Sequence, residues 1–138
     1  MLTPFHLAIP VNNLAAAAKF YGDVLGCEQG RNDSHWIDWN FFGHQLVTHL
    51  VELMPKSIMP NEVDNKAVPV PHFGVVLHEQ QWLETADKIK QNGIAFVIEP
   101  YIRFKGKTGE QGTFFLYDPA GNALEFKYFS DMTQVFAV

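Results

Sequence analysis

Two stretches of the chain carry apolar residues at helical spacing, and a short strand-like stretch precedes each of them. Asn13 can cap the start of the first helical stretch and Gly26 can end it, while Gly93 ends the second, which begins at residue 79. Short extended runs predict strands at 4–11, 27–32, 35–42, 44–53, 71–77, 94–100, 112–119 and 122–129. The order is strand, helix and three strands, and it occurs twice.

The two halves also keep the same register. His72 lies 66 residues after His6, and Gly93 lies 67 residues after Gly26. We therefore expect an α+β fold of two tandem βαβββ modules within one domain, residues 1–138. The modules would span 1–54 and 72–129, joined by a proline-rich linker at 55–71 without clear periodicity and followed by a tail at 130–138.

Composition narrows the functional classes. The chain has 138 residues, 47% of them hydrophobic, and a net charge of −5, so it lacks the basic stripe that nucleic-acid-binding proteins use. No segment approaches the roughly 20 apolar residues that a membrane helix needs. The opening residues do not have the pattern of a secretion signal, and the single cysteine, Cys27, fits a reducing compartment. We expect a cytoplasmic protein that binds neither nucleic acid nor membrane.

Alternation along the strands predicts which side chains share a face of the sheet. His6, His72 and Glu125 fall on the face opposite the one that packs on the helices. In the matching strand of the first half, His44 and His49 point to opposite faces, and the count from the turn glycines favours His49. Taken singly, each could be an ordinary surface side chain. Three imidazoles and one carboxylate together predict a site for a divalent transition metal.

A basic loop with several glycines, residues 101–112, separates the strands of the second half. Its simplest interpretation is a solvated hairpin. The alternative is a lid over a bound substrate, in which Arg103 or Lys105 meets an anionic group. We take Arg103 as the candidate substrate-binding residue.

The segments "FHLAIPVNNLAAAAKFYGDVLGC", "PHFGVVL" and "DPAGNALEF" resemble the motifs of the vicinal oxygen chelate superfamily, which includes glyoxalase I, extradiol dioxygenases and bleomycin-resistance proteins. The resemblance covers nearly the whole chain. It implies a curved mixed sheet with a metal-binding cleft, often completed by dimerisation. The metal positions of the family match His6, His49, His72 and Glu125.

The resemblance also implies an activity. Glyoxalase I enzymes usually carry an acidic residue where this chain has His49, which leaves Glu125 alone to move a substrate proton. Extradiol dioxygenases bind iron through two histidines and a glutamate at positions resembling His6, His72 and Glu125. We therefore expect a dioxygenase-like enzyme that acts on a small substrate with adjacent oxygens, using Fe, Mn, Zn or Ni.

Other interpretations stay open at this stage. The chain could be a glyoxalase I-type lyase or isomerase, a drug-sequestering protein of the bleomycin-resistance type, or a protein whose metal is only structural. A homodimer is expected, because both modules expose sheet edges and the tail carries Val135 and Phe136 with no place in either repeat.

Overall fold

A computed structural model describes residues 2–56 and 58–138 of the protein. The chain forms two compact units. Unit 1 contains residues 2–56 together with Asp118–Asn122, and unit 2 contains residues 58–117 together with Ala123–Val138. A short turn of the second half of the chain therefore belongs to the unit built by the first half.

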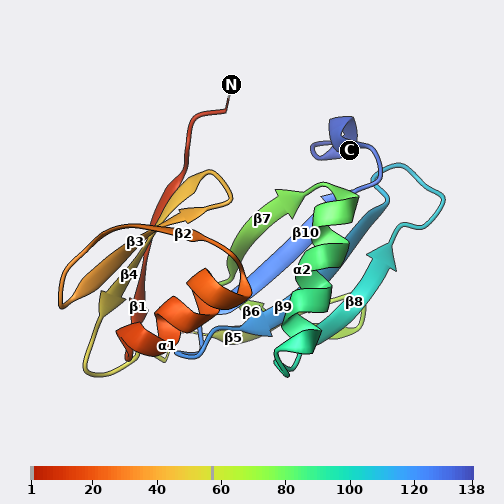
Figure 1. The fold of residues 1–138 in the computed structure, drawn as a ribbon. Helices are drawn as coiled ribbons and strands as arrows, with labels where there is room; N and C mark the ends of the chain where they lie inside the picture. The colour runs from red at the N-terminus through yellow and green to blue at the C-terminus, as the bar shows by residue number, and fades with distance from the viewer. Residues whose placement is uncertain (1, 57) are drawn as a thin grey trace. The chain divides into compact units, whose positions relative to one another are not determined.

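Unit 1 is a mixed sheet with the strand order β1-β4-β3-β2 (Figure 1). Asn13 caps its helix, since the Asn13 side chain accepts a hydrogen bond from the backbone N–H of Ala16 at 2.9 Å. Gly26 follows with a φ of 75°, a left-handed conformation that suits glycine and stops the helix. The elements are β1 (His6–Val11), α1 (Leu14–Ala18), a π-helical continuation (Lys19–Val24), β2 (Glu28–Asn32), β3 (Trp36–Phe41) and β4 (His44–Leu50).

Unit 2 repeats this arrangement with the order β7-β10-β9-β8. Its elements are β5 (Met59–Val63), β6 (Lys66–Val70), β7 (Phe73–Leu77), α2 (Glu79–Gln91), β8 (Ile98–Arg103), β9 (Gln111–Tyr117), β10 (Ala123–Phe129) and a 3₁₀ turn (Met132–Gln134). The strand expected at 94–100 is displaced, because β8 begins only at Ile98. No helix in the described part of the chain is long and apolar enough to cross a membrane.

The strands pair in corresponding ways within the two sheets. The first strand of each βαβββ module pairs in parallel with its last strand, β1 with β4 and β7 with β10. Leu7 lies opposite Leu46, and Phe73 lies opposite Leu124. Because the pairing partners correspond, a position in one unit can be compared directly with its counterpart in the other. The α+β fold of two βαβββ modules is confirmed.

Residues 55–71 differ from the expected irregular linker. β5 and β6 form an antiparallel hairpin, with Asp64 and Asn65 at the turn in left-handed conformations. Pro60 and Pro69 lie opposite each other in this ribbon. Proline cannot donate a backbone hydrogen bond, so within sheets it is confined to edge strands. Both strands of this hairpin are edge strands and accommodate prolines, which is why the sequence did not predict them as strands.

Side chains on the two faces of the unit 2 sheet differ in character. α2 covers one face, where the Trp82 indole N–H donates to the Phe126 carbonyl at 2.9 Å and the Phe114 and Phe126 rings stack at 5.4 Å (Figure 1). The strand register brings polar side chains together on the opposite face. We call this the polar face of unit 2; it carries Tyr101, Arg103, Gln111, Thr113 and Glu125, and the register places Phe115, Lys127 and Phe129 on it as well.

The turn between β9 and β10 is held by Asp118, which is 4% exposed. Its Oδ1 accepts hydrogen bonds from the backbone N–H groups of Ala120 and Asn122, at 2.9 and 2.8 Å. Its Oδ2 accepts from the Tyr21 hydroxyl at 2.7 Å and from the Asn122 side chain at 2.9 Å. Asn122 also donates to the Pro10 carbonyl at 2.8 Å. The "DPAGN" motif therefore ties itself into unit 1 through one carboxylate.

Candidate metal centre

His72 and Glu125 form a pair on unit 2. His72 directly precedes β7 and Glu125 lies on β10, with His72 Nε2 3.2 Å from Glu125 Oε1. The other ring nitrogen of His72, Nδ1, lies 2.7 Å from the Pro69 carbonyl oxygen. Since a carbonyl only accepts, the hydrogen-bond network assigns a proton to Nδ1 and turns Nε2 toward the carboxylate. Phe115 packs edge-on against the imidazole, with ring centroids 5.0 Å apart.

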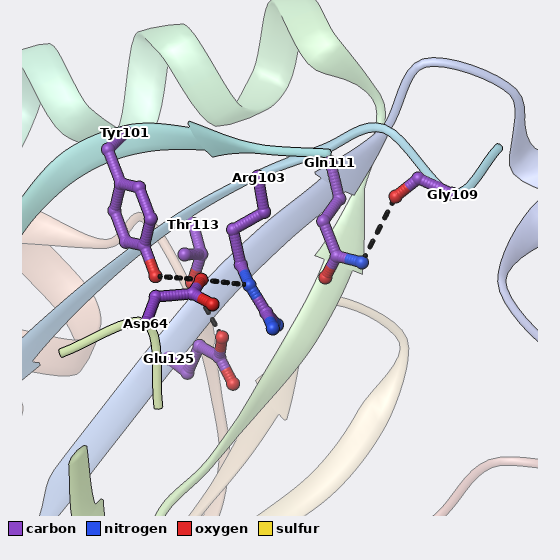
Figure 2. Close-up of polar contacts among 7 residues, drawn as sticks. All are labelled: Asp64, Tyr101, Arg103, Gly109, Gln111, Thr113 and Glu125. Carbon is purple, nitrogen blue, oxygen red and sulfur yellow. Dashed lines mark hydrogen bonds and ion pairs between the residues drawn. The ribbon is translucent and has the colours of Figure 1, made fainter. Parts of the chain in front are cut away.

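Thr113 fixes the second oxygen of Glu125. The Thr113 hydroxyl donates to Glu125 Oε2 at 2.5 Å (Figure 2). Thr113 is 1% exposed, so its hydroxyl is held within the protein rather than by solvent. Glu125 Oε2 is thus bound by Thr113, while Oε1 faces the imidazole of His72.

The pair shifts both ionisations toward charge. Hydrogen bonding to Glu125 raises the pKa of His72 and outweighs the burial of the ring, which lowers it. Burial raises the pKa of Glu125, but the hydrogen bonds from His72 and Thr113 prevail, so the pKa of this carboxyl lies below its usual value. Without a metal, the pair thus favours the imidazolium and carboxylate forms over the neutral ones.

The pH dependence of this pair can be measured. In metal-free protein the His72 imidazole should titrate above pH ~6.5, the ordinary histidine value, because its pKa is raised. The ion pair stabilises the folded state fully between about pH 4.5 and about pH 6.5, and the contribution is lost as pH rises through the higher pKa of folded His72. NMR of the imidazole carbons would follow the midpoint, which Glu125→Gln should move downward. A wild-type midpoint at or below 6.5 would contradict the assignment.

His6 and His49 lie in unit 1, on one face of its sheet as alternation predicted, but at different levels. His6 is opposite Gln45, and its Nδ1 lies 2.9 Å from Gln45 Oε1. His49 is opposite Pro10, four positions further along β1. At ~3.3 Å per residue this separates the two backbones by about 13 Å along the strand. The structure does not bring these two histidines together.

The repeat identifies the unit 1 counterpart of Glu125 as Val47. Glu125 lies opposite Gly74, two positions after His72, and Val47 lies opposite Ala8, two positions after His6. His49 is one further step along the same face. Within either unit, no three His, Cys, Asp or Glu side chains of the described residues group into a metal site.

Arg103, expected in the loop at 101–112, is instead the last residue of β8. Its Nε donates to Asp64 Oδ2 at 2.6 Å, and the Tyr101 hydroxyl donates to the same oxygen at 3.0 Å (Figure 2). The Arg103 hydrogen bond lowers the pKa of Asp64, whereas burial and Asp64 raise the pKa of Tyr101 to about 12. The tip of the β5–β6 hairpin is thereby tethered to the sheet edge.

Several residues of this region were not singled out from the sequence. Thr113 could have been found, because it lies on the same face of β9 as the position paired with Glu125. Asp64 gives no local signal, since its partners are 37 and 39 residues away.

Comparison with known proteins places the chain. The model of the Glyoxalase/Bleomycin resistance protein/Dioxygenase superfamily matches residues 3–126. The chain belongs to this superfamily. A superfamily protein from Alicyclobacillus acidocaldarius, described as a glyoxalase/bleomycin resistance protein/dioxygenase, is 36% identical with a TM-score of 0.78, covering 97% of this chain and 96% of its own. A search of curated proteins found no match.

More distant superfamily structures share the fold. Lactoylglutathione lyase from Agrobacterium tumefaciens is 18% identical with a TM-score of 0.68, covering 100% of this chain and 98% of its own. A genomically encoded fosfomycin resistance protein from Listeria monocytogenes is 15% identical with a TM-score of 0.69, covering 98% and 100%. At these identities the likeness concerns the fold alone.

Members of the superfamily commonly use a divalent metal, and the His72–Glu125 pair has the features of metal ligands. A ligating histidine normally binds through one nitrogen while the other donates to a carbonyl or carboxylate, and ligating carboxylates are themselves hydrogen-bonded. His72 has the Pro69 carbonyl and Glu125 has Thr113 in these roles. The donor set therefore fits a divalent ion as far as two ligands.

Proposed function

We propose that the protein is a metal-dependent enzyme in which His72 and Glu125 supply ligands to a divalent ion and the substrate is a small molecule with two adjacent oxygens. The observation that supports this most is the pair itself, in which His72 Nε2 faces Glu125 Oε1. The Pro69 carbonyl holds His72 Nδ1, and the Thr113 hydroxyl holds Glu125 Oε2. A bound ion would act as a Lewis acid toward the substrate oxygens.

Each protein group has a separate task in this proposal. The Pro69 carbonyl keeps the proton on His72 Nδ1, so that Nε2 remains a donor of electrons. Thr113 restrains Oε2 of Glu125 and leaves Oε1 facing His72. Glu125 is the carboxylate proposed both to ligate and to accept a substrate proton. Arg103 is the cation proposed to meet the substrate's polar end.

We favour oxygenase chemistry over a glyoxalase I-type reaction. The latter requires a base to move a proton between neighbouring carbons, and a second carboxylate commonly serves it. His49 is a poor base when bound to a metal, and Val47, the register counterpart of Glu125, has no ionisable group. An oxygenase reaction needs only one carboxylate and open metal positions for dioxygen, and this residue set matches it better.

His6 and His49 remain predicted ligands from the sequence repeat. Because they lie at different levels of one face, we expect at most one of them to ligate a given ion. The metal content of His6→Ala and His49→Ala protein would separate them. The homodimer and the cytoplasmic location also stay proposals. Light scattering at micromolar concentration would test the homodimer.

Metal analysis tests the first part of the proposal. Protein purified without added metal should contain a transition metal, and Glu125→Ala and His72→Ala should each reduce its affinity by about 10-fold to 100-fold or more, since each removes a ligand. His35→Ala is the matched control, because the His35 side chain bonds only its neighbour Ser34 among the described residues. Equal metal content in all four proteins would contradict the site.

Oxygen uptake tests the second part. Iron-loaded protein should consume oxygen with a catechol or another adjacent-oxygen compound, and His72→Ala should remove this activity by at least about 100-fold. Glutathione-dependent turnover of methylglyoxal by nickel- or zinc-loaded protein, without oxygen uptake, would instead establish the glyoxalase alternative. Tight binding of a drug-like molecule by metal-free protein would favour the sequestering alternative.

A further inference from the structure

Gln111, the first residue of β9, has an oxygen without a hydrogen-bond partner. The residue is 7% exposed, and its Nε2 donates to the Gly109 carbonyl at 3.2 Å. Its Oε1 is shielded from solvent and accepts no hydrogen bond from any described residue. Reversing the amide would place this oxygen against the Gly109 carbonyl, so the orientation is set by the network. A buried acceptor left unpaired destabilises the protein unless something supplies a donor.

Arg103 stands beside this oxygen with unused donors. Arg103 and Gln111 are direct cross-strand neighbours on the polar face of unit 2, which puts their Cβ atoms at about 5 Å. Arg103 donates a hydrogen bond through Nε to Asp64 and its guanidinium lies 4.8 Å from the centre of the Phe104 ring, while its terminal nitrogens make no hydrogen bond with the described residues. Figure 2 shows both side chains projecting from their strands to the side on which Glu125 lies. Donors and one free acceptor thus stand side by side.

Charge and hydrogen-bond capacity together select the group that fits. Asp64 already balances the charge of Arg103, so the site does not demand an anion. A carboxylate has only acceptor oxygens and would turn one of them toward Gln111 Oε1. A carboxamide offers a carbonyl oxygen to Arg103 and an N–H to Gln111, satisfying both.

We propose that Arg103 and Gln111 form a subsite on the polar face of unit 2 that binds a carboxamide group of the substrate. This rests on the proposed function and narrows its substrate class to compounds whose adjacent oxygens include an amide carbonyl. Because Gln111 Oε1 is closed to solvent, the proposal requires the side chains around it to move when the N–H enters. The buried acceptor is thereby kept for a ligand.

The test compares pyruvamide with pyruvate on metal-free protein. Both present two neighbouring carbonyl oxygens, but only the amide carries N–H donors. In ¹⁵N NMR titrations, pyruvamide should shift the side-chain signals of Gln111 and Arg103. Gln111→Met, which keeps the length of the side chain and removes the acceptor, should weaken pyruvamide binding by about fivefold or more and leave pyruvate binding unchanged or tighter.

Gln91→Met, an exposed change on α2, is the matched control and should alter neither affinity. Pyruvate binding as tightly as pyruvamide, or pyruvamide binding without a shift at Gln111, would overturn the subsite and leave Oε1 paired with a trapped water. The wild-type titration decides this even if the Gln111 variant does not fold. Because no metal is present, the outcome is independent of whether His72 and Glu125 bind one.

Discussion

Asp118→Ala is expected to lower the free energy of unfolding by about 4 kcal/mol, because one buried carboxylate accepts hydrogen bonds from three different residues. Removing it leaves the Tyr21 hydroxyl without its acceptor and the Asn122 side chain with only the Pro10 carbonyl. Tyr21 is buried and Asp118 is 4% exposed, so water cannot replace the lost partner without rearrangement. The turn also loses the hydrogen bonds that Asp118 Oδ1 accepts from the backbone N–H groups of Ala120 and Asn122. Urea unfolding of wild type and variant measures the difference.

Tyr21→Phe is the matched control for this effect. It removes a single hydrogen bond, 2.7 Å long, and leaves the other contacts of Asp118 in place. Burial and the neighbouring Asp118 raise the pKa of Tyr21 well above its ordinary value, so its hydroxyl remains a donor at all ordinary pH values. A loss of about 1.5 kcal/mol is expected. If the free energy of unfolding of Asp118→Ala protein lay within about 1 kcal/mol of the wild-type value, the turn would not be held by this carboxylate.

Gly74→Ala is expected to disrupt the pairing of β7 with β10 and lower stability by about 3 kcal/mol or more. A Cβ added at Gly74 would lie 1.5 Å from the Glu125 carbonyl oxygen and 2.6 Å from its carbonyl carbon. Both are backbone atoms of the paired strand, so no side-chain rotation relieves the clash. The strands must separate, and the Glu125 side chain moves away from His72.

The same variant should therefore lose metal binding together with stability. Gly30→Ala, in β2, is the control, since its added Cβ would meet Asp38 at 3.4 Å, an ordinary contact distance. A change within about 0.5 kcal/mol is expected there. Urea unfolding and metal analysis of both variants give the result. If Gly74→Ala matched wild type in both measurements, the close approach of β7 to Glu125 would be wrong.

Much of the fold follows from local sequence patterns. The positions of the helix ends were predictable because a capping Asn13 and the glycines Gly26 and Gly93 act on the backbone next to them. The doubled βαβββ order and the faces of the strands were predictable because helical and strand periodicities are properties of neighbouring residues. These patterns singled out Glu125 and His72, which the structure places 3.2 Å apart, and their binding of a metal stays a prediction.

Register is decided only when strands meet. Alternation shows that His49 shares a face with His6, but it does not say which residues lie opposite each other, and the pairing of His49 with Pro10 placed it two positions beyond the counterpart of Glu125. That position belongs to Val47, whose apolar side chain gave no reason to single it out.

Contacts between distant segments also needed the tertiary structure. Asp64 lies in a stretch whose prolines conceal a hairpin, and its bond to Arg103 joins residues 39 positions apart. The orphaned oxygen of Gln111 is equally invisible in the sequence, since whether a polar atom has a partner depends on every segment that folds around it. Patterns along the chain describe what each segment prefers, whereas hydrogen-bond pairing and burial are properties of the assembled fold.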